Sequence, residues 1–430
     1  MFRLFWISVA GRNGLLGFSE RCRCVVVALG LAALMGGWVP SASGQWFFDV
    51  IEFDTVTGEE GDGGGLKENA SIAVDTLGNP HVAFTTEGDL VQELVYAFWD
   101  GADWQSSTII GDAIVPSLTL NSIDQAHVSF TGGITGGLGH AFRGLSGLWT
   151  VTEVDGSASG IRPGSFSSIA LDPIENPVIS SQTVLTGGTP GAELRFASVG
   201  GTAFTNVRVD PATIGGGASA DPTADTGWYT SIEVDSGSGF SRISYYDAGS
   251  GDLRFATQTG ASTWSTETVD ATGDVGQFSS LELDSSGNAH IGYYSTTGEV
   301  KLAAWNGTTW DIETVASGLT ASPDHLTLAL DGSDGRHITY LSSNGDGTSS
   351  VIYGFDGGSG WSLETVAGNA ISSSLDGEVD GGGAHLVYEN NSGELIYATN
   401  VASVPEPTAG VLLMVAGLAA VGRRRKRSRG

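Results

Sequence analysis

A unit of four short apolar segments recurs along the middle of the chain and limits what the chain can fold into. The clearest copy contains residues 280–284, 288–294, 299–305 and 309–315. Each segment alternates or runs apolar over four to seven residues, and Gly, Asn, Ser or Thr residues bound it. This pattern predicts four strands joined by tight turns.

Two repeated sequence features, one in the third segment and one at the end of the first segment, each occur in seven units. The third segment of each unit carries a variant of Leu-x-aromatic-Ala, as at Leu94–Ala97 and Leu395–Ala398, and the units recur about every 45 to 63 residues. This period is typical of the four-stranded blades of a propeller. We therefore expect an all-β chain, with a seven-bladed β-propeller of four-stranded blades over residues 45–400. The first segment of each unit ends in an acid or amide: Asp75, Asn121, Asp172, Asp235, Asp284, Asp331 and Asp380.

The fourth segment indicates how the ring closes. Its opening aromatic residue occurs only six times, because the last unit stops after Ala398. The missing segment stands at the front of the domain, at Trp46–Ile51. A linear solenoid has no reason to split one unit between its ends, whereas a ring closed by the N-terminal strand leaves no unpaired edge.

The repeated histidines and tryptophans have a structural and a functional interpretation. Five histidines begin the second segment of their units, and a catalytic site needs one constellation rather than five separate copies. We expect these histidines to lock turns and the fourth-segment aromatics to pack between blades, rather than to bind metal or stack on sugars. The repeated residues are His81, His127, His290, His337 and His385, with Trp46, Trp104, Trp149, Trp264, Trp310 and Trp361.

Residues 1–44 have the pattern of an export signal. Four arginines precede the apolar run Val25–Met35, and the small residues Ala42 and Gly44 precede a cleavage site before Gln45. An uncleaved anchor is the alternative. Both cysteines, Cys22 and Cys24, lie inside this signal peptide, so we expect no disulfide and no cysteine nucleophile in the mature protein.

Residues 401–430 contain three further parts in order: the motif Val404-Pro405-Glu406-Pro407, the apolar run Thr408–Gly422, and six basic residues within 423–429. This segment resembles the PEP-CTERM sorting signal of Gram-negative bacteria. The resemblance implies processing by an exosortase-type enzyme and export through the inner membrane. Transient anchoring by a transmembrane sorting helix would then precede release to the cell surface, outer envelope or extracellular matrix. An ordinary membrane anchor is the alternative, although 15 helical residues span only about 22 Å.

The charge of the remaining domain excludes some partners. Residues 45–404 contain nine basic and 46 acidic residues, a formal charge of −37. Such a surface repels nucleic acid and anionic lipid, so we expect no nucleic-acid partner and membrane contact only through the C-terminal helix.

Motifs of catalysis do not occur in the mature chain. It has no Gly-x-Ser-x-Gly elbow, phosphate loop or His-Glu-x-x-His. The turns before Trp264 and Trp310 share the glycine-to-tryptophan spacing of the sialidase Asp-box but lack its aspartate. We expect no enzyme, no catalytic residue, no metal site and no cofactor. Calcium stays an alternative for the acidic loops Asp331–Gly335 and Asn344–Gly347.

Two long connections before first strands break the repeat and are candidate ligand-face loops. Tolerated loop growth explains them equally well. The expected function is binding or scaffolding, with an exopolysaccharide or a surface protein as partner; a glycan hydrolase or lyase and a multivalent lectin are the alternatives. The connections are Gly156–Phe166, which contains Arg162, and Pro211–Tyr229, which contains Asp221, Asp225, Trp228 and Tyr229.

Overall fold

The computed structural model describes residues 46–53, 70–87, 92–133, 136–158, 161–185, 191–200, 203–210, 225–319, 325–380 and 383–401, without the side chains of 52, 53, 87 and 372–374. The described residues form strands and turns but no helix. The strands make six sheets, five of four strands and one of seven. The expectation of an all-β chain with repeated four-stranded sheets is confirmed.

Each four-stranded sheet consists of four consecutive antiparallel strands, which we call a unit. Unit 1 contains β2 (Ala70–Val74), β3 (Pro80–Glu87), β4 (Gln92–Trp99) and β5 (Trp104–Gly111). Unit 2 contains β6 (Ala113–Leu120), β7 (Ala126–Gly132), β8 (Gly137–Arg143) and β9 (Trp149–Asp155). Unit 3 contains β10 (Ile161–Leu171), β11 (Pro177–Leu185), β12 (Gly191–Gly200) and β13 (Ala203–Asp210). Unit 4 contains β14 (Trp228–Val234), β15 (Ser241–Asp247), β16 (Asp252–Gly260) and β17 (Thr263–Asp270). Unit 5 contains β18 (Val275–Leu283), β19 (Ala289–Ser295), β20 (Glu299–Trp305) and β21 (Trp310–Ser317).

The seven-stranded sheet joins the last two units. Its strands are β22 (Leu326–Leu330), β23 (Arg336–Ser343), β24 (Ser349–Asp356), β25 (Ser362–Asp380), β26 (Gly383–Asn390), β27 (Glu394–Thr399) and β1 (Phe47–Phe53). The first half of β25 pairs with β24 and the second half with β26, and the register shifts between Ala370 and Leu375. Unit 6 contains β22, β23, β24 and the first half of β25, and unit 7 contains the second half of β25, β26, β27 and β1. The two units share one sheet because no turn interrupts β25 between them.

The first described strand completes unit 7. β1 pairs antiparallel with β27, with Phe47 opposite Thr399 and Asp49 opposite Tyr397. The predicted pairing of the opening segment of the mature chain with its closing segment is confirmed.

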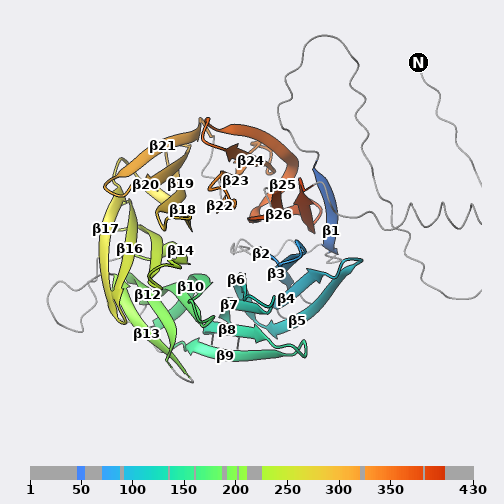
Figure 1. Cartoon of the computed structure of the whole chain (residues 1–430). Coiled ribbons are helices and arrows are strands. Elements are labelled where there is room, and N and C mark those ends of the chain that lie inside the picture. Colours follow the sequence, from blue (N-terminus) through green and yellow to red (C-terminus); the bar gives the residue numbers. More distant parts are fainter. Residues whose placement is uncertain are drawn as a thin grey trace, which may run out of the picture. The chain divides into compact units, whose positions relative to one another are not determined.

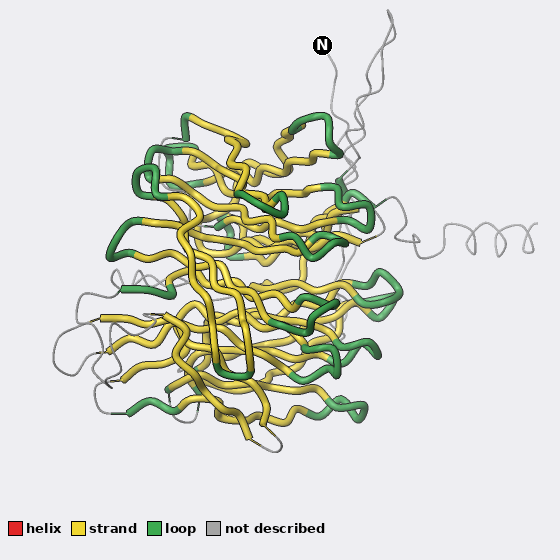
Figure 2. The backbone as a smooth tube through the Cα atoms, turned by 60° about the vertical axis from the view of Figure 1, so that its left-hand side comes forward, coloured by secondary structure: helices red, strands yellow, loops and turns green. Residues whose placement is uncertain are grey.

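The units contact one another through their first strands. Figure 1 shows these strands nearest to a common centre and the fourth strands outside. Contacts between first strands run from β2 through β6, β10, β14, β18 and β22 to β25, and β25 in turn contacts β2. Figure 2 shows turns gathered at the ends of the strands.

A side chain four residues before the acid or amide that ends each first strand joins neighbouring units. Ser71 Oγ accepts a hydrogen bond from the backbone N–H of Leu118 at 3.1 Å, which links unit 1 to unit 2. At the last two junctions, Thr327 Oγ1 donates to Asp376 Oδ1 at 3.0 Å, and Asp376 Oδ2 accepts from the N–H of Ile72 at 2.9 Å. The serines at the intervening junctions are Ser117, Ser168, Ser231 and Ser280.

The aromatic residues of the fourth strands pack between units. Six of the seven lie against a third-strand ring of the preceding unit. The pairs and their centroid distances are Trp149–Tyr96 (5.1 Å), Phe204–His140 (5.5 Å), Trp264–Phe196 (5.0 Å), Trp310–Phe255 (5.2 Å), Trp46–Tyr353 (5.2 Å) and Trp104–Tyr397 (5.6 Å). Trp361 instead packs on the apolar cluster around Tyr294 and lies under the guanidinium of Arg336.

The signal peptide predicted at residues 1–44 lies outside the described residues. So does the predicted sorting segment with its helix, beyond residue 401. Within the described ranges, no helix is long and apolar enough to span a membrane.

Candidate functional site

The first strands of units 2 to 5 are irregular near their beginning. Each has a shift of register, and beside it one residue with a side chain adopts a left-handed backbone conformation. For a bulky or β-branched residue this conformation is an outlier that costs about 1–3 kcal/mol. Strain held at one position in four successive units marks this end of the strands as a candidate functional surface. The four residues are Val115 (φ 54°), Phe166 (φ 50°), Tyr229 (φ 51°) and Phe278 (φ 52°).

Three of these residues belong to a row of aromatic side chains that crosses units 3 to 6. We call Phe166, Trp228, Tyr229, Phe278 and His325 the aromatic arc; all five are half-buried. Tyr229 lies between its neighbours, with centroid distances of 4.7 Å to Phe166 and 4.2 Å to Phe278. Trp228 extends the row at 5.2 Å from Phe166, and His325 extends it at 5.8 Å from Phe278.

Hydrogen bonds fix the arc in place. The indole Nε1 of Trp228 donates to Asp225 Oδ1 at 2.7 Å, and Ser279 Oγ donates to the backbone oxygen of Tyr229 at 2.8 Å. Beneath the arc, the hydroxyl of Tyr246 donates to Asp274 Oδ1 at 2.7 Å, and burial raises the pKa of Tyr246 to about 12. The arc therefore presents ordered ring surfaces, which lose little side-chain entropy when a ligand binds.

Four carboxyl groups lie farther along the first strands. Glu233 is four residues after Tyr229, or about 13 Å along the strand. Burial, and then the charge of Glu378, raise the pKa of Glu233 to about 8, and burial raises that of Glu378 to about 7. Burial and the charges of its neighbours also raise the pKa of Glu282, and burial raises that of Asp376. These acids hold protons at a pH where exposed carboxyl groups are ionised.

The structure assigns the predicted ligand-face residues to different surroundings. Asp225, Trp228 and Tyr229 lie together at the arc, whereas Asp221 is outside the described residues. Arg162 is exposed and belongs to β10, opposite Val184. The prediction that Arg162, Trp228 and Tyr229 lie in loops is wrong: the first strands begin earlier than expected, because their bulges interrupt the alternation that marks a strand.

Sequence reasoning missed Phe166, Phe278 and His325. A signal for two of them exists, since an aromatic residue stands two positions before the junction serine in Phe166-Ser167-Ser168, Tyr229-Thr230-Ser231 and Phe278-Ser279-Ser280. His325 stands at the same place, two positions before the junction residue Thr327, although it precedes β22.

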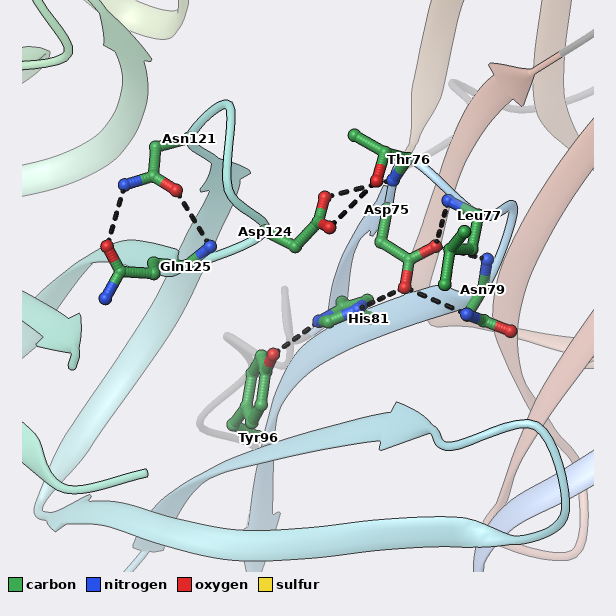
Figure 3. Close-up of polar contacts among 9 residues, drawn as sticks. All are labelled: Asp75, Thr76, Leu77, Asn79, His81, Tyr96, Asn121, Asp124 and Gln125. Carbon is green, nitrogen blue, oxygen red and sulfur yellow. Dashed lines mark hydrogen bonds and ion pairs between the residues drawn. The ribbon is translucent and has the colours of Figure 1, made fainter. Parts of the chain in front are cut away.

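The repeated histidine of unit 1, His81, forms a latch inside its own unit (Figure 3). Asp75 Oδ1 accepts from the N–H groups of Leu77 and Asn79, both at 2.8 Å, and Asp75 Oδ2 lies 3.5 Å from His81 Nε2. Because Nε2 donates to the carboxylate, Nδ1 of His81 accepts a hydrogen bond from the hydroxyl of Tyr96. Burial lowers the pKa of His81. The latch closes a turn and keeps its histidine inside the sheet.

The latch recurs with variations. His337 and His385 lie between a carboxylate (Asp331 at 3.3 Å, Asp380 at 2.8 Å) and a tyrosine hydroxyl. His290 Nε2 lies 3.6 Å from Asp284, and its Nδ1 has no hydrogen-bond partner. His127 contacts His140 instead. The five predicted histidines thus stay in five separate units.

The acidic loop at Asp331 has the same turn geometry. Asp331 Oδ1 accepts from the N–H groups of Ser333 and Gly335. In the described part of the chain, no three His, Cys, Asp or Glu side chains are grouped so that they could hold a metal ion.

Most basic side chains are engaged within the sheets. Arg195 and Arg208 contact the buried Glu193, and Lys301 Nζ lies 2.5 Å from Asp270. Arg143 lies over the ring of Tyr96 at 5.3 Å. Ion pairs also hold Arg242, Arg254 and Arg336.

The C-terminal segment has a known counterpart. Residues 403–427 match the PEP-CTERM protein-sorting motif, which includes Val404, Pro405, Glu406 and Pro407. The chain is therefore an all-β repeat protein with the sorting signal of exported, exosortase-processed proteins.

Comparison with solved structures gives distant likenesses. The chain is similar to the fucose-specific lectin from Aleuria aurantia (14% identity, TM-score 0.44, 71% of this chain and 95% of the lectin). It is also similar to a protein of unknown function from Dyadobacter fermentans (11%, 0.49, 74% and 98%) and to the intramolecular trans-sialidase from Ruminococcus gnavus (12%, 0.43, 79% and 96%). No curated protein matches the chain in sequence.

Proposed function

We propose that residues 45–400 form a closed seven-bladed β-propeller whose seventh blade is completed by β1. The cyclic contacts of the first strands support this proposal. So do the side-chain hydrogen bonds at the junctions between units, including the one from Ile72 to Asp376 between the first and the last.

On this scaffold, the protein acts as a non-catalytic polysaccharide-binding protein, and the aromatic arc is its ligand surface. The observation that carries the proposal is the row of half-buried rings held at strained positions of adjacent blades. A sugar ring offers C–H groups on its faces, and these fit the electron-rich face of an aromatic ring. Consecutive rings match consecutive sugars of a polymer.

The charge of the domain indicates the class of polysaccharide, and the sorting signal indicates where the protein is located. With a charge of −37 over residues 45–404, an anionic polymer is repelled, so the ligand is a neutral polysaccharide. The sorting signal supports a location at the cell surface or in the extracellular matrix, where a surface protein is the other available partner.

The engagement of polar side chains supports a role without catalysis. The described histidines of the repeat lie in latches or in a histidine pair, and most arginines lie in ion pairs or on rings. Of the described arginines, the exposed Arg162 is the exception, so few of these side chains are left to act as a base or to hold a substrate carboxylate.

The test is retention of the purified protein on neutral polysaccharides, beginning with the host's own exopolysaccharide. Tyr229→Ala and Phe278→Ala should each weaken binding by about 2 kcal/mol, roughly 30-fold. Phe240→Ala is the matched control, because Phe240 is 39% exposed in the turn between β14 and β15, away from the arc. Equal binding by all three variants would exclude the arc, and no retention on any polysaccharide would leave a protein-binding or scaffold role.

A glycan-active enzyme is the second candidate, and the raised pKa values of Glu233 and Glu378 favour it, since a carboxyl protonated near neutral pH can act as a general acid. This candidate predicts release of reducing ends from the retained polysaccharide, lost in Glu378→Gln. Intact polymer after long incubation with the wild type excludes it.

A further inference from the structure

A cavity of about 320 Å³ lies in the cleft between units 2 and 3. Unit 2 lines it with His127, His140 and Phe142, and unit 3 lines it with Glu175, Asn176 and Phe204. Asn176 belongs to the turn between β10 and β11, at the opposite end of the strands from the arc. The cavity is therefore separate from the proposed polysaccharide surface.

The cavity exists because three side chains at this junction, one from unit 2 and two from unit 3, are smaller than their counterparts at the preceding junction. In the cleft between units 1 and 2, the ring of Trp149 packs on Tyr96 at 5.1 Å, and Arg143 covers Tyr96 and Phe98 at 5.3 and 5.0 Å.

At the corresponding places between units 2 and 3, His140 stands for Tyr96 and Phe204 for Trp149. Val199 stands for Arg143. These three smaller side chains leave a space between units 2 and 3. Between units 1 and 2, the larger side chains fill the corresponding space.

The polar wall of the cavity is a pair of imidazole rings. His127 Nδ1 and His140 Nε2 are 3.2 Å apart, and each residue is only 6% exposed. Burial lowers the pKa of His127 to about 4 and that of His140 to about 3, so both rings are uncharged at neutral pH. An uncharged pair shares one N–H···N hydrogen bond and leaves one nitrogen on each ring.

In units 1, 6 and 7, the latch aspartate lies against Nε2 of the histidine, but unit 2 has no such aspartate. Asn121 replaces the latch aspartate, and its amide donates to Gln125 Oε1 at 3.1 Å rather than meeting the histidine. Within the described ranges, no side chain hydrogen-bonds His127 Nε2. This nitrogen is available to a hydroxyl group inside the cavity.

We propose that this cavity binds one neutral sugar ring. Phe142 and Phe204 offer apolar contact for a ring face, and the imidazole pair and Asn176 offer donors and acceptors for hydroxyl groups. The carboxylate of Glu175 at the wall disfavours an anionic ligand.

The site is independent of the aromatic arc, so its failure and that of the arc are separable. Together the two sites would let one molecule hold two glycan chains.

The experiment follows the ring protons of His127 and His140 by NMR while the full protein is titrated with glucose, galactose, mannose, fucose and N-acetylglucosamine. We expect saturable shifts of both rings with at least one sugar. The double variant His140→Tyr/Phe204→Trp restores two of the three side chains of the preceding junction, so it should fold while losing the response of His127.

Tyr229→Ala is the control for the arc: it should weaken retention on polysaccharide and leave the monosaccharide response unchanged. The absence of a saturable shift with all five sugars overturns the proposal. So does an undiminished response in a folded double variant.

Discussion

The indole ring of Trp46 packs edge-on against the ring of Tyr353, with centroids 5.2 Å apart and planes inclined at 77°. Its Nε1 also donates to Glu364 Oε1 at 3.0 Å. Trp149 makes the same ring contact with Tyr96, at 5.1 Å and 77°. Trp46 therefore makes the same inter-unit ring contact as Trp149, although about 300 residues of sequence separate it from its partner Tyr353.

Replacing Trp46 tests this seam. Trp46→Ala removes the ring and leaves a cavity at the junction of units 6 and 7, so the free energy of unfolding should fall by about 3–4 kcal/mol in urea denaturation. Phe48→Ala is the control, because Phe48 lies in the same strand but is 51% exposed; it should change stability by less than about 0.5 kcal/mol. Equal losses in both variants would argue against a packed seam.

The acids with raised pKa values predict that neutralising one of them raises stability at high pH. The pKa of Glu282 is raised in the folded state, so its ionisation lowers stability as the pH rises from the ordinary carboxyl pKa to the folded-state pKa, and stability stays lowered above it. Glu282→Gln should therefore raise the melting temperature at pH 9, and the difference from wild type should shrink as the pH falls toward 5. The exposed Glu267 provides the control Glu267→Gln, which should change the melting temperature little at pH 9. A destabilised Gln variant at pH 9 contradicts the prediction.

The pair His127 and His140 predicts a loss of stability in acid. His127 and His140 have lowered pKa values in the folded state, so the unfolded chain binds more protons below pH about 6.5. Each contributes stability above that pH that is lost as the pH falls toward about 4, at up to about 1.4 kcal/mol per pH unit. His140→Tyr removes one of these groups, and its unfolding free energy should decline less steeply than that of the wild type between pH 6.5 and 4. Parallel curves would contradict the burial of the pair.

The latch turns predict a graded pair of variants. Asp75→Ala removes the acceptor for Leu77 and Asn79 and should cost about 2 kcal/mol. Asp75→Asn should cost less than about 1 kcal/mol, because Asn121 caps the corresponding turn of unit 2 through Oδ1, with the N–H of Gln125 at 2.9 Å. Chemical denaturation measures both, and an Asn variant as unstable as the Ala variant would show that the latch depends on the carboxylate's charge.

Much of the architecture could be predicted because the repeated residues are visible in the sequence. The strand-ending acids, the third-strand theme and the missing seventh aromatic residue determine the number of units and the partner of the N-terminal strand. The fusion of units 6 and 7 could not be predicted, since the sequence from 362 to 380 carries turn-forming Gly, Asn and Ser residues that the structure keeps extended.

The candidate site was predicted only in part, and the reason is local. Trp228 and Tyr229 could be predicted because the sequence places them in a long connection, but the arc depends on backbone bulges that place Phe166 and Phe278 beside Tyr229. A bulge changes which face a side chain occupies without changing composition. The cavity beside His127 was also missed, because it results from three small deviations in different strands that meet only in the folded protein.

Amide hydrogen exchange of the protein with and without its polysaccharide tests the central claim most directly. The account predicts slower exchange on binding in peptides that contain Phe166, Trp228–Tyr229 and Phe278, with no change around Phe240. Protection confined to other surfaces, with these three segments unaffected in a bound complex, would contradict it.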